Sequence, residues 1–153
     1  MAYGGYSLGG LAAIYSLYFD ETFSTIFSVC GSFWYPGFAD YVVNNNVKNR
    51  NAAVYLLNGE QEGVNHGNLL EQAPVKAHMV HEHLMSVMNA VSIFDEYGHH
   101  ENKSERINRL LSVLTGMEGS YENGTCIKIE ATVCRLQQID RSSEWRRIHI
   151  LQS

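Results

Sequence analysis

Proline and cysteine are both scarce in this chain of 153 residues. There are two prolines and three cysteines, and no repeated or low-complexity segment. The cysteines, Cys30, Cys126 and Cys134, are odd in number and lack the spacing of a metal site. A dense disulfide framework is therefore excluded, and reduced thiols in a reducing compartment are favoured. We expect a cytoplasmic protein.

Long apolar runs and an excess of basic residues are also absent. No run is long enough to span a membrane, and the first residues lack the basic and apolar regions of a signal peptide. Eleven Lys and Arg residues face sixteen Asp and Glu residues, a net charge of -5. This balance argues against nucleic acid or an anionic membrane surface as a partner. The 45% hydrophobic content is enough for the core of a globular domain.

Segments typical of strands alternate with segments typical of helices. Short β-branched and aromatic runs predict strands, and amphipathic stretches between them predict helices. Four strand–helix repeats indicate an α/β fold with a parallel sheet and flanking helices. The predicted strands are 2–6, 24–32, 52–62 and 90–100, and the predicted helices are 8–18, 38–46, 72–88 and 104–116.

The pattern changes after Gly116. Residues 117–153 contain one alternating stretch and otherwise no clear periodicity. A flexible extension, a loosely attached hairpin and an oligomer contact all stay open for this segment. We therefore predict two parts, an α/β domain over 1–116 and an irregular or β-rich tail over 117–153.

A serine stands between glycines near the N-terminus, in the sequence GGYSLGG. Ser7 has Gly5 two positions before it and Gly9 two positions after it. This is the pattern of a nucleophile elbow, a sharp strand-to-helix turn that exposes the serine hydroxyl. An ordinary glycine-rich turn can share the bare pattern, but the flanking strand and helix favour the elbow. We predict Ser7 as a nucleophile, with the Leu8 N–H as a donor to the oxyanion.

Two later segments supply an acid and a base in the chain order that an elbow requires. Glu60 and Glu62 follow the third predicted strand, and His99 and His100 follow the fourth. The carboxyl ends of parallel strands meet at one edge of a sheet, so these groups can approach Ser7. A histidine there takes the serine proton, and a carboxylate orients the imidazole. The residues alone leave both choices open.

Three aromatic residues follow the second predicted strand. Phe33, Trp34 and Tyr35 stand where they can overhang the site and bind an apolar or aromatic group of the substrate. Packing as core at the edge of the sheet is an equally good interpretation.

Three histidines form an HxxHxH pattern in the third predicted helix. His78 and His81 share a face, His83 points elsewhere, and no third ligand follows at a recognisable spacing. We therefore expect a solvated helix face, no metal ion and no cofactor.

These segments together resemble the bacterial putative-esterase family of the α/β-hydrolase fold, which includes siderophore (enterobactin-type) esterases. GYSLGGLAAIYSLY is similar to the family's elbow and following helix, and FSVCGSFWYPGF to its strand ending in Ser-Gly-Ser-Phe/Leu-Trp, with Cys30 where serine is usual. VYLLNGEQE is similar to the strand ending in Gly-x-x-Asp/Glu, and FDEYGHHENKSERINRLLSVL to the histidine loop and closing helix. The resemblance covers roughly 2–116 and implies a serine esterase.

Carried over by position, the resemblance implies Ser7 as the nucleophile, Glu62 as the acid and His100 as the base. Glu62 falls on the acid of Gly-x-x-Asp/Glu, and His100 falls on the histidine of Gly-x-His. The family's phenylalanine after that histidine is absent here. His99 therefore stays open as the base, as Glu60 does as the acid.

The resemblance extends over only the C-terminal half of such an enzyme. In this fold the elbow follows the fifth strand of an eight-stranded sheet, and the loop with the second oxyanion donor precedes it. We expect an exposed sheet edge that a second copy or a partner chain covers. We also expect a small-molecule ester as substrate, with activity lowered or lost through the missing segment. The alternative is a non-catalytic hydrolase remnant that serves as an interaction or oligomerisation module.

Overall fold

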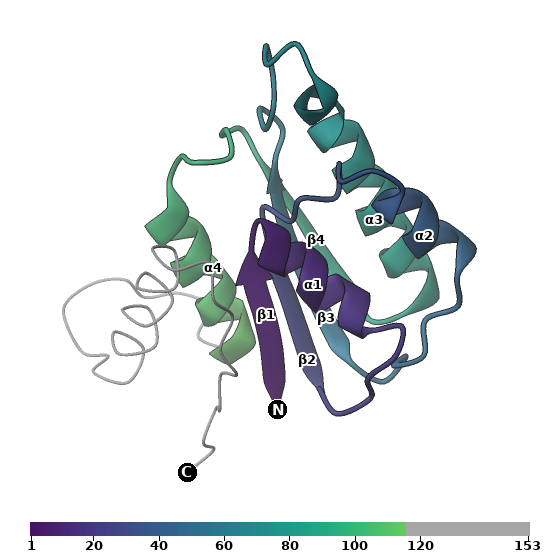
Figure 1. Cartoon of the computed structure of the whole chain (residues 1–153). Helices are drawn as coiled ribbons and strands as arrows, with labels where there is room; N and C mark the ends of the chain where they lie inside the picture. The colour runs from purple at the N-terminus through teal and green to yellow at the C-terminus, as the bar shows by residue number, and fades with distance from the viewer. Residues whose placement is uncertain (116–153) are drawn as a thin grey trace, which may run out of the picture. The chain divides into compact units, whose positions relative to one another are not determined.

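A computed structural model of the chain, which describes residues 1–115, contains a four-stranded, all-parallel sheet (Figure 1). The strands lie in the sheet in the order in which they occur in the sequence. The predicted α/β class with a parallel sheet is confirmed. The strands are β1 (Ala2–Tyr6), β2 (Thr25–Val29), β3 (Ala53–Gly59) and β4 (Ala90–Asp95).

Three helices connect these strands. Right-handed crossovers that always step in the same direction across a sheet leave their helices on one face of it. Residues of all three helices accordingly enter one core cluster together with residues of the sheet. The helices are α1 (Leu8–Ser16), α2 (Phe38–Asn44) and α3 (Ala73–Val87), with a short 3-10 turn (Leu69–Gln72) before α3 and a further helix α4 (Lys103–Thr115) after β4.

The described chain divides into two units. The first, Met1–Glu101, holds the sheet and helices α1 to α3, and the second begins at Asn102 and holds α4. The predicted domain over 1–116 thus combines the first unit with α4. The predicted tail, 117–153, lies outside the described residues. Up to residue 115, no helix is both long and apolar enough to cross a membrane.

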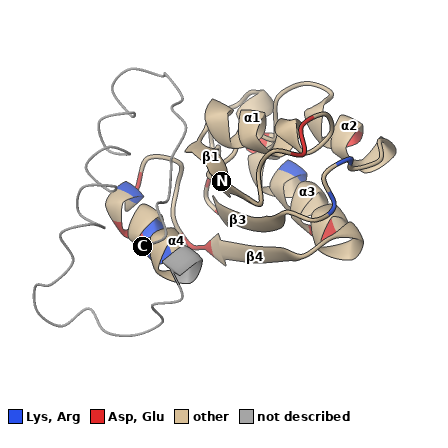
Figure 2. Ribbon diagram, turned by 90° about the horizontal axis from the view of Figure 1, so that it is seen from below, with Lys and Arg blue, Asp and Glu red and all other residues tan. Residues whose placement is uncertain are grey.

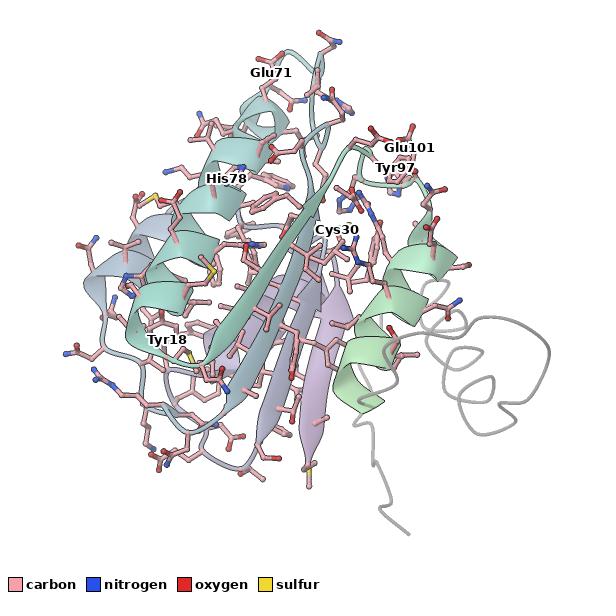
Figure 3. The ribbon with its side chains drawn as sticks, turned by 180° about the vertical axis from the view of Figure 1, so that it is seen from behind. Tyr18, Cys30, Glu71, His78, Tyr97 and Glu101 are labelled. Atoms are coloured by element: carbon pink, nitrogen blue, oxygen red, sulfur yellow. The ribbon has the colours of Figure 1, made fainter. Side chains whose placement is uncertain are left out.

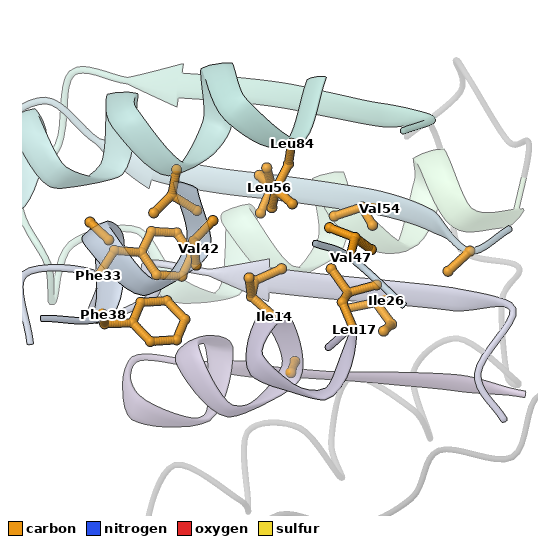
Figure 4. Packing of buried hydrophobic residues seen from close by; sticks show 14 of the residues in the cluster. Ile14, Leu17, Ile26, Phe33, Phe38, Val42, Val47, Val54, Leu56 and Leu84 are labelled. Carbon is orange, nitrogen blue, oxygen red and sulfur yellow. The ribbon is translucent and has the colours of Figure 1, made fainter. Parts of the chain in front are cut away.

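The core lies between the sheet and helices α1 to α3 (Figure 4). Strands β1 to β3 contain no charged residue, and β4 contains only Asp95 at its end (Figure 2). This composition is typical of parallel strands that are covered on their faces. Both helices and strands contribute large, fully buried side chains to the cluster. They include Ile14 in α1 and Leu17 just after it, Ile26 in β2, Leu56 in β3 and Leu84 in α3.

A glycine allows helix α1 to approach the end of β2 closely. A Cβ atom at Gly10 would meet the hydroxyl of Ser28, with Gly31 Cα at 3.0 Å and the Gly5 carbonyl oxygen at 3.1 Å. A side chain at position 10 would therefore push the helix away from the strand. Because Gly10 has no side chain, the first turn of α1, which follows Ser7, can pack against the end of β2.

Replacing Gly10 by alanine should lower the free energy of unfolding by about 1–3 kcal/mol, because the added methyl group overpacks this contact. The Ser28 hydroxyl has no hydrogen-bond partner among the described residues. Ser28→Ala should therefore cost little alone and should recover part of the loss in the double variant. Urea unfolding of wild type, the two single variants and the double variant gives the coupling free energy between positions 10 and 28. Strictly additive effects would show that the hydroxyl does not limit the approach of the helix.

Candidate active site

Ser7 occupies the turn between β1 and α1 in a strained backbone conformation. Its φ of 58° and ψ of -124° are rarely adopted by residues other than glycine. Such strain costs about 1–3 kcal/mol and persists only where the surroundings enforce it. The Ser7 N–H donates to the Val29 carbonyl at 3.0 Å, and the Ser7 carbonyl accepts from the N–H groups of Leu11 and Ser32, each at 3.1 Å. These bonds fix a turn with the geometry expected of a nucleophile elbow.

The Ser7 hydroxyl meets an imidazole that in turn meets a buried carboxylate. His99 Nε2 lies 3.0 Å from Ser7 Oγ, and His99 Nδ1 lies 2.8 Å from Glu62 Oε2. The three residues follow β1, β3 and β4 and meet at the carboxyl ends of these strands. A carboxylate only accepts hydrogen bonds, so Nδ1 carries the proton and Nε2 is the acceptor for the hydroxyl. The arrangement is suited to removing a proton from Ser7.

The histidine in this contact is His99 and not His100, so the base that the resemblance implies is corrected to the alternate. His100 is exposed, and its ring packs edge to face on the His99 ring with 4.8 Å between centroids. Ser7 and Glu62 are brought together as predicted. The alternate base therefore takes the place that the Gly-x-His motif gave to its neighbour.

The loop after β4 shows why the histidine position moved by one residue. Gly98 N–H donates to Glu101 Oε2 at 2.8 Å, and Glu101 N–H donates to the Gly98 carbonyl at 3.4 Å. These two bonds close a tight turn around the two histidines. The Tyr6 hydroxyl donates to the carbonyl of His99 and ties this residue to the strand that precedes Ser7. The turn thus presents His99 inward and leaves His100 on the outside.

Glu60, the alternate acid, takes part in a different contact. Its Oε1 lies 2.9 Å from His78 Nε2 on helix α3, and both side chains are more than 40% exposed, at 43% and 42%. An exposed pair of this kind contributes little stability. Of the two glutamates, Glu62 alone contacts the histidine beside Ser7.

Of the three aromatic residues predicted to bind substrate, Phe33 is a core residue. It is 1% exposed and stacks on Phe38. A substrate at the surface cannot reach it, so this part of the prediction is wrong. Trp34 is half-buried and Tyr35 is exposed, and these two side chains retain a surface that an apolar group can contact.

Sequence reasoning missed Ser32, which also contacts the nucleophile candidate. Ser32 is buried, and its Oγ lies 3.1 Å from Ser7 Oγ. Its N–H donates to the Ser7 carbonyl. The strand order held the signal, because residues just after β2 must lie beside the turn that follows β1. The hydroxyl can hold the Ser7 Oγ in position between two partners.

Leu8 begins helix α1, as the prediction of an oxyanion donor requires. The first N–H groups of a helix have no acceptor within the helix and carry the positive end of its dipole. The Leu8 N–H therefore adjoins the Ser7 hydroxyl in sequence and has the polarity that an oxyanion needs.

Cys30 lies beside the acid and the base at the carboxyl ends of the strands (Figure 3). One ligand atom each from Cys30, Glu62 and His99 lie within 4.8 Å of one another. Thiolate, carboxylate and imidazole are ligands that zinc accepts. A metal bound through His99 Nδ1 would displace the proton between this atom and Glu62, and one bound through Nε2 would occupy the lone pair that faces Ser7. Metal binding and the hydrogen-bonded arrangement are therefore mutually exclusive.

His81 lies on the buried face of α3, so the prediction of a solvated histidine face is wrong for this residue. It is 1% exposed. The stripe that faces the core runs through Ala77, Val80 and Leu84, and His81 falls within it. Helical spacing from the alanines could have revealed this phase. Burial, reinforced by the nearby His78, lowers the pKa of His81 to about 3.

No protein-family model matches the chain, and no curated protein matches its sequence.

Ser7→Gly should be more stable than Ser7→Ala by about 1–2 kcal/mol, since glycine relieves the strain at φ 58° and alanine retains it. Both variants lose the hydroxyl, so its hydrogen bonds cancel in the comparison. Urea unfolding of the two variants measures the difference. Equal stabilities would show that the turn stores no strain.

The buried His81 should make the protein sensitive to acid. Because its pKa in the folded chain is about 3, against an ordinary 6.5, the unfolded chain binds the proton more readily between these values. The contribution of neutral His81 to the free energy of unfolding is fully present above pH 6.5. It is lost progressively as the pH falls from 6.5 toward 3. Between pH 7 and pH 5 the loss should be about 2 kcal/mol. In His81→Gln this loss should disappear, and parallel losses in the two proteins would contradict the assignment.

Proposed function

We propose that this protein is a serine hydrolase that cleaves carboxylic esters. The contact from Ser7 through His99 to Glu62, with Ser7 in a strained turn before a helix, carries the proposal. The esterase resemblance of the surrounding motifs supports esters as the substrate class. Trp34 and Tyr35 favour an apolar or aromatic group on the substrate. Cytoplasmic location, and a second copy or partner chain along the outer strand β1, stay predictions.

In the proposed reaction Ser7 Oγ attacks the ester carbonyl carbon while its proton moves to His99 Nε2. Glu62 stabilises the imidazolium that forms, and the Leu8 N–H donates to the oxyanion of the tetrahedral intermediate. The intermediate collapses as His99 returns the proton to the leaving alcohol, and the acyl group stays on Ser7. Water then attacks the acyl carbon, with His99 taking its proton, and releases the acid and the serine.

The test uses p-nitrophenyl butyrate turnover and labelling by a fluorophosphonate probe, and the chain supplies its own matched controls. His99→Gln should lower turnover at least about 10³-fold, whereas His100→Gln, on the neighbouring exposed residue, should stay near wild type. Glu62→Gln should lower turnover by about 10–10⁴-fold, whereas Glu60→Gln should have little effect. Mass mapping should place the probe on Ser7, with no label on Ser7→Ala.

Turnover that is equal in wild type and Ser7→Ala would overturn the proposal. Failure of wild type to react with the probe would favour a non-catalytic module that keeps the geometry without the chemistry. Equal losses in His99→Gln and His100→Gln would refute the assignment of His99 as the base.

A further inference from the structure

The carboxylate of Glu62 is held by neutral donors. Glu62 is 3% exposed, and within residues 1–115 no Lys or Arg forms an ion pair with it. Its Oε1 accepts from Gly59 N–H at 2.6 Å and from Asn58 Nδ2 at 3.4 Å, while Oε2 faces His99. A buried carboxylate must be satisfied by hydrogen bonds. The Asn58 amide is thus one of the two donors to Oε1, and it can donate only while its Nδ2 faces Glu62.

The Asn58 amide has one orientation that satisfies all its neighbours. Its Nδ2 donates to the Gly31 carbonyl at 3.2 Å and to Glu62, and its Oδ1 lies 3.0 Å from His81 Nε2. Rotating the amide by 180° would bring Oδ1 against two acceptors and Nδ2 against the imidazole. The two acceptors thus fix the orientation of the amide, and its Oδ1 is left facing His81 Nε2, where a donor satisfies it and adds to the support of this orientation.

His81 supplies that donor in a defined tautomer. Its Nδ1 lies 2.8 Å from Ser92 Oγ on strand β4, and its Nε2 faces Asn58 Oδ1. A neutral imidazole has one N–H, and the amide oxygen can only accept. The proton therefore lies on Nε2, and Nδ1 accepts from the Ser92 hydroxyl.

Aromatic rings hold the His81 imidazole in place. The ring of Phe94 lies 4.5 Å away between centroids, and that of Phe33 lies 6.1 Å away in an edge-to-face arrangement. His78 stacks on the same Phe94 ring from α3, at 3.8 Å. Figure 3 labels His78 on α3, the helix that also carries His81. Phe33, excluded as a substrate contact, thus helps to position His81.

We propose that Ser92, His81 and Asn58 form a neutral hydrogen-bond relay that orients the Glu62 carboxylate toward His99. The members are positioning residues, and they act on the substrate only through Glu62 and His99. The relay links helix α3 and strand β4 to the acid that follows β3. Its part in turnover rests on the proposed function, but its geometry can be tested without activity.

The direct test is ¹⁵N-resolved NMR of the imidazoles in the full chain near pH 7. Wild type should show His81 neutral with the proton on Nε2, and His99 with a low-field Nδ1–H signal from its bond to Glu62. A charged His81, or a proton on its Nδ1, would overturn the relay. This measurement needs no substrate, so it separates failure of the relay from failure of the hydrolase proposal.

Variants at His81 test whether this residue influences His99 through Asn58 and Glu62. His81→Leu removes the donor to Asn58 and should shift or broaden the His99 Nδ1–H signal, whereas His81→Gln keeps a donor and should restore it. His83→Leu on the same helix is the matched control and should leave the signal unchanged. If His81→Leu fails to fold, Ser92→Ala should give a weaker change of the same kind. An unchanged His99 signal in a folded His81→Leu or in Ser92→Ala would refute the coupling.

In the turnover assay His81→Leu should lower kcat by about tenfold to a hundredfold at nearly constant KM, as partners that orient a functional group do. His81→Gln should recover most of this loss. A rise in KM at constant kcat would assign His81 to substrate binding and contradict a role through Glu62.

Discussion

The strained backbone of Ser7 is the constraint on which the rest of the site depends. A serine at φ 58° returns to a relaxed conformation unless other bonds forbid it. The end of β2 supplies two of these bonds, through the Val29 carbonyl and the Ser32 N–H, and the Gly10 contact presses α1 against the same segment. Strand pairing and helix packing therefore stabilise the turn jointly, and the direction of the hydroxyl is a consequence of the fold.

Topology then decides what the hydroxyl meets. Parallel strands end at one edge, so the segments after β3 and β4 converge on the turn after β1 although they lie far away in sequence. Glu62 and His99 arrive in this way, and the Tyr6 hydroxyl closes the arrangement from the strand that leads to Ser7. The same edge holds Ser32 and Cys30. Each of these residues stands at the end of a strand or within a few residues after it, so the strand ends determine which side chains meet.

Sequence reasoning predicted the order of elements and the turn at Ser7, because periodicity and strand ends depend on local residues. The choice of Glu62 over Glu60 came from the family resemblance. Sequence reasoning failed where a single tertiary bond decides between neighbours. The local Gly98–Glu101 turn encloses both histidines alike, and the bond from the Tyr6 hydroxyl, far away in sequence, is made to His99. The prediction that His81 is solvated is wrong because histidine is usually a polar surface residue. Only the helical spacing of the buried alanines and Leu84 indicates that His81 lies on the buried face of α3. Phe33 was ambiguous, since an aromatic residue after a strand serves core and site equally.

The donors around the Glu62 carboxylate, apart from His99, are neutral. A basic residue beside this carboxylate would repel a protonated His99 and so offset the support that Glu62 gives to it. Neutral donors orient it and leave its charge for the imidazole. The donor to Asn58 is a histidine that stays neutral inside the fold. Burial beside Phe94 and Phe33 keeps it neutral by lowering the pKa of His81. The acid sensitivity of the fold and the neutral donor to Asn58 therefore have a common cause, the burial of His81.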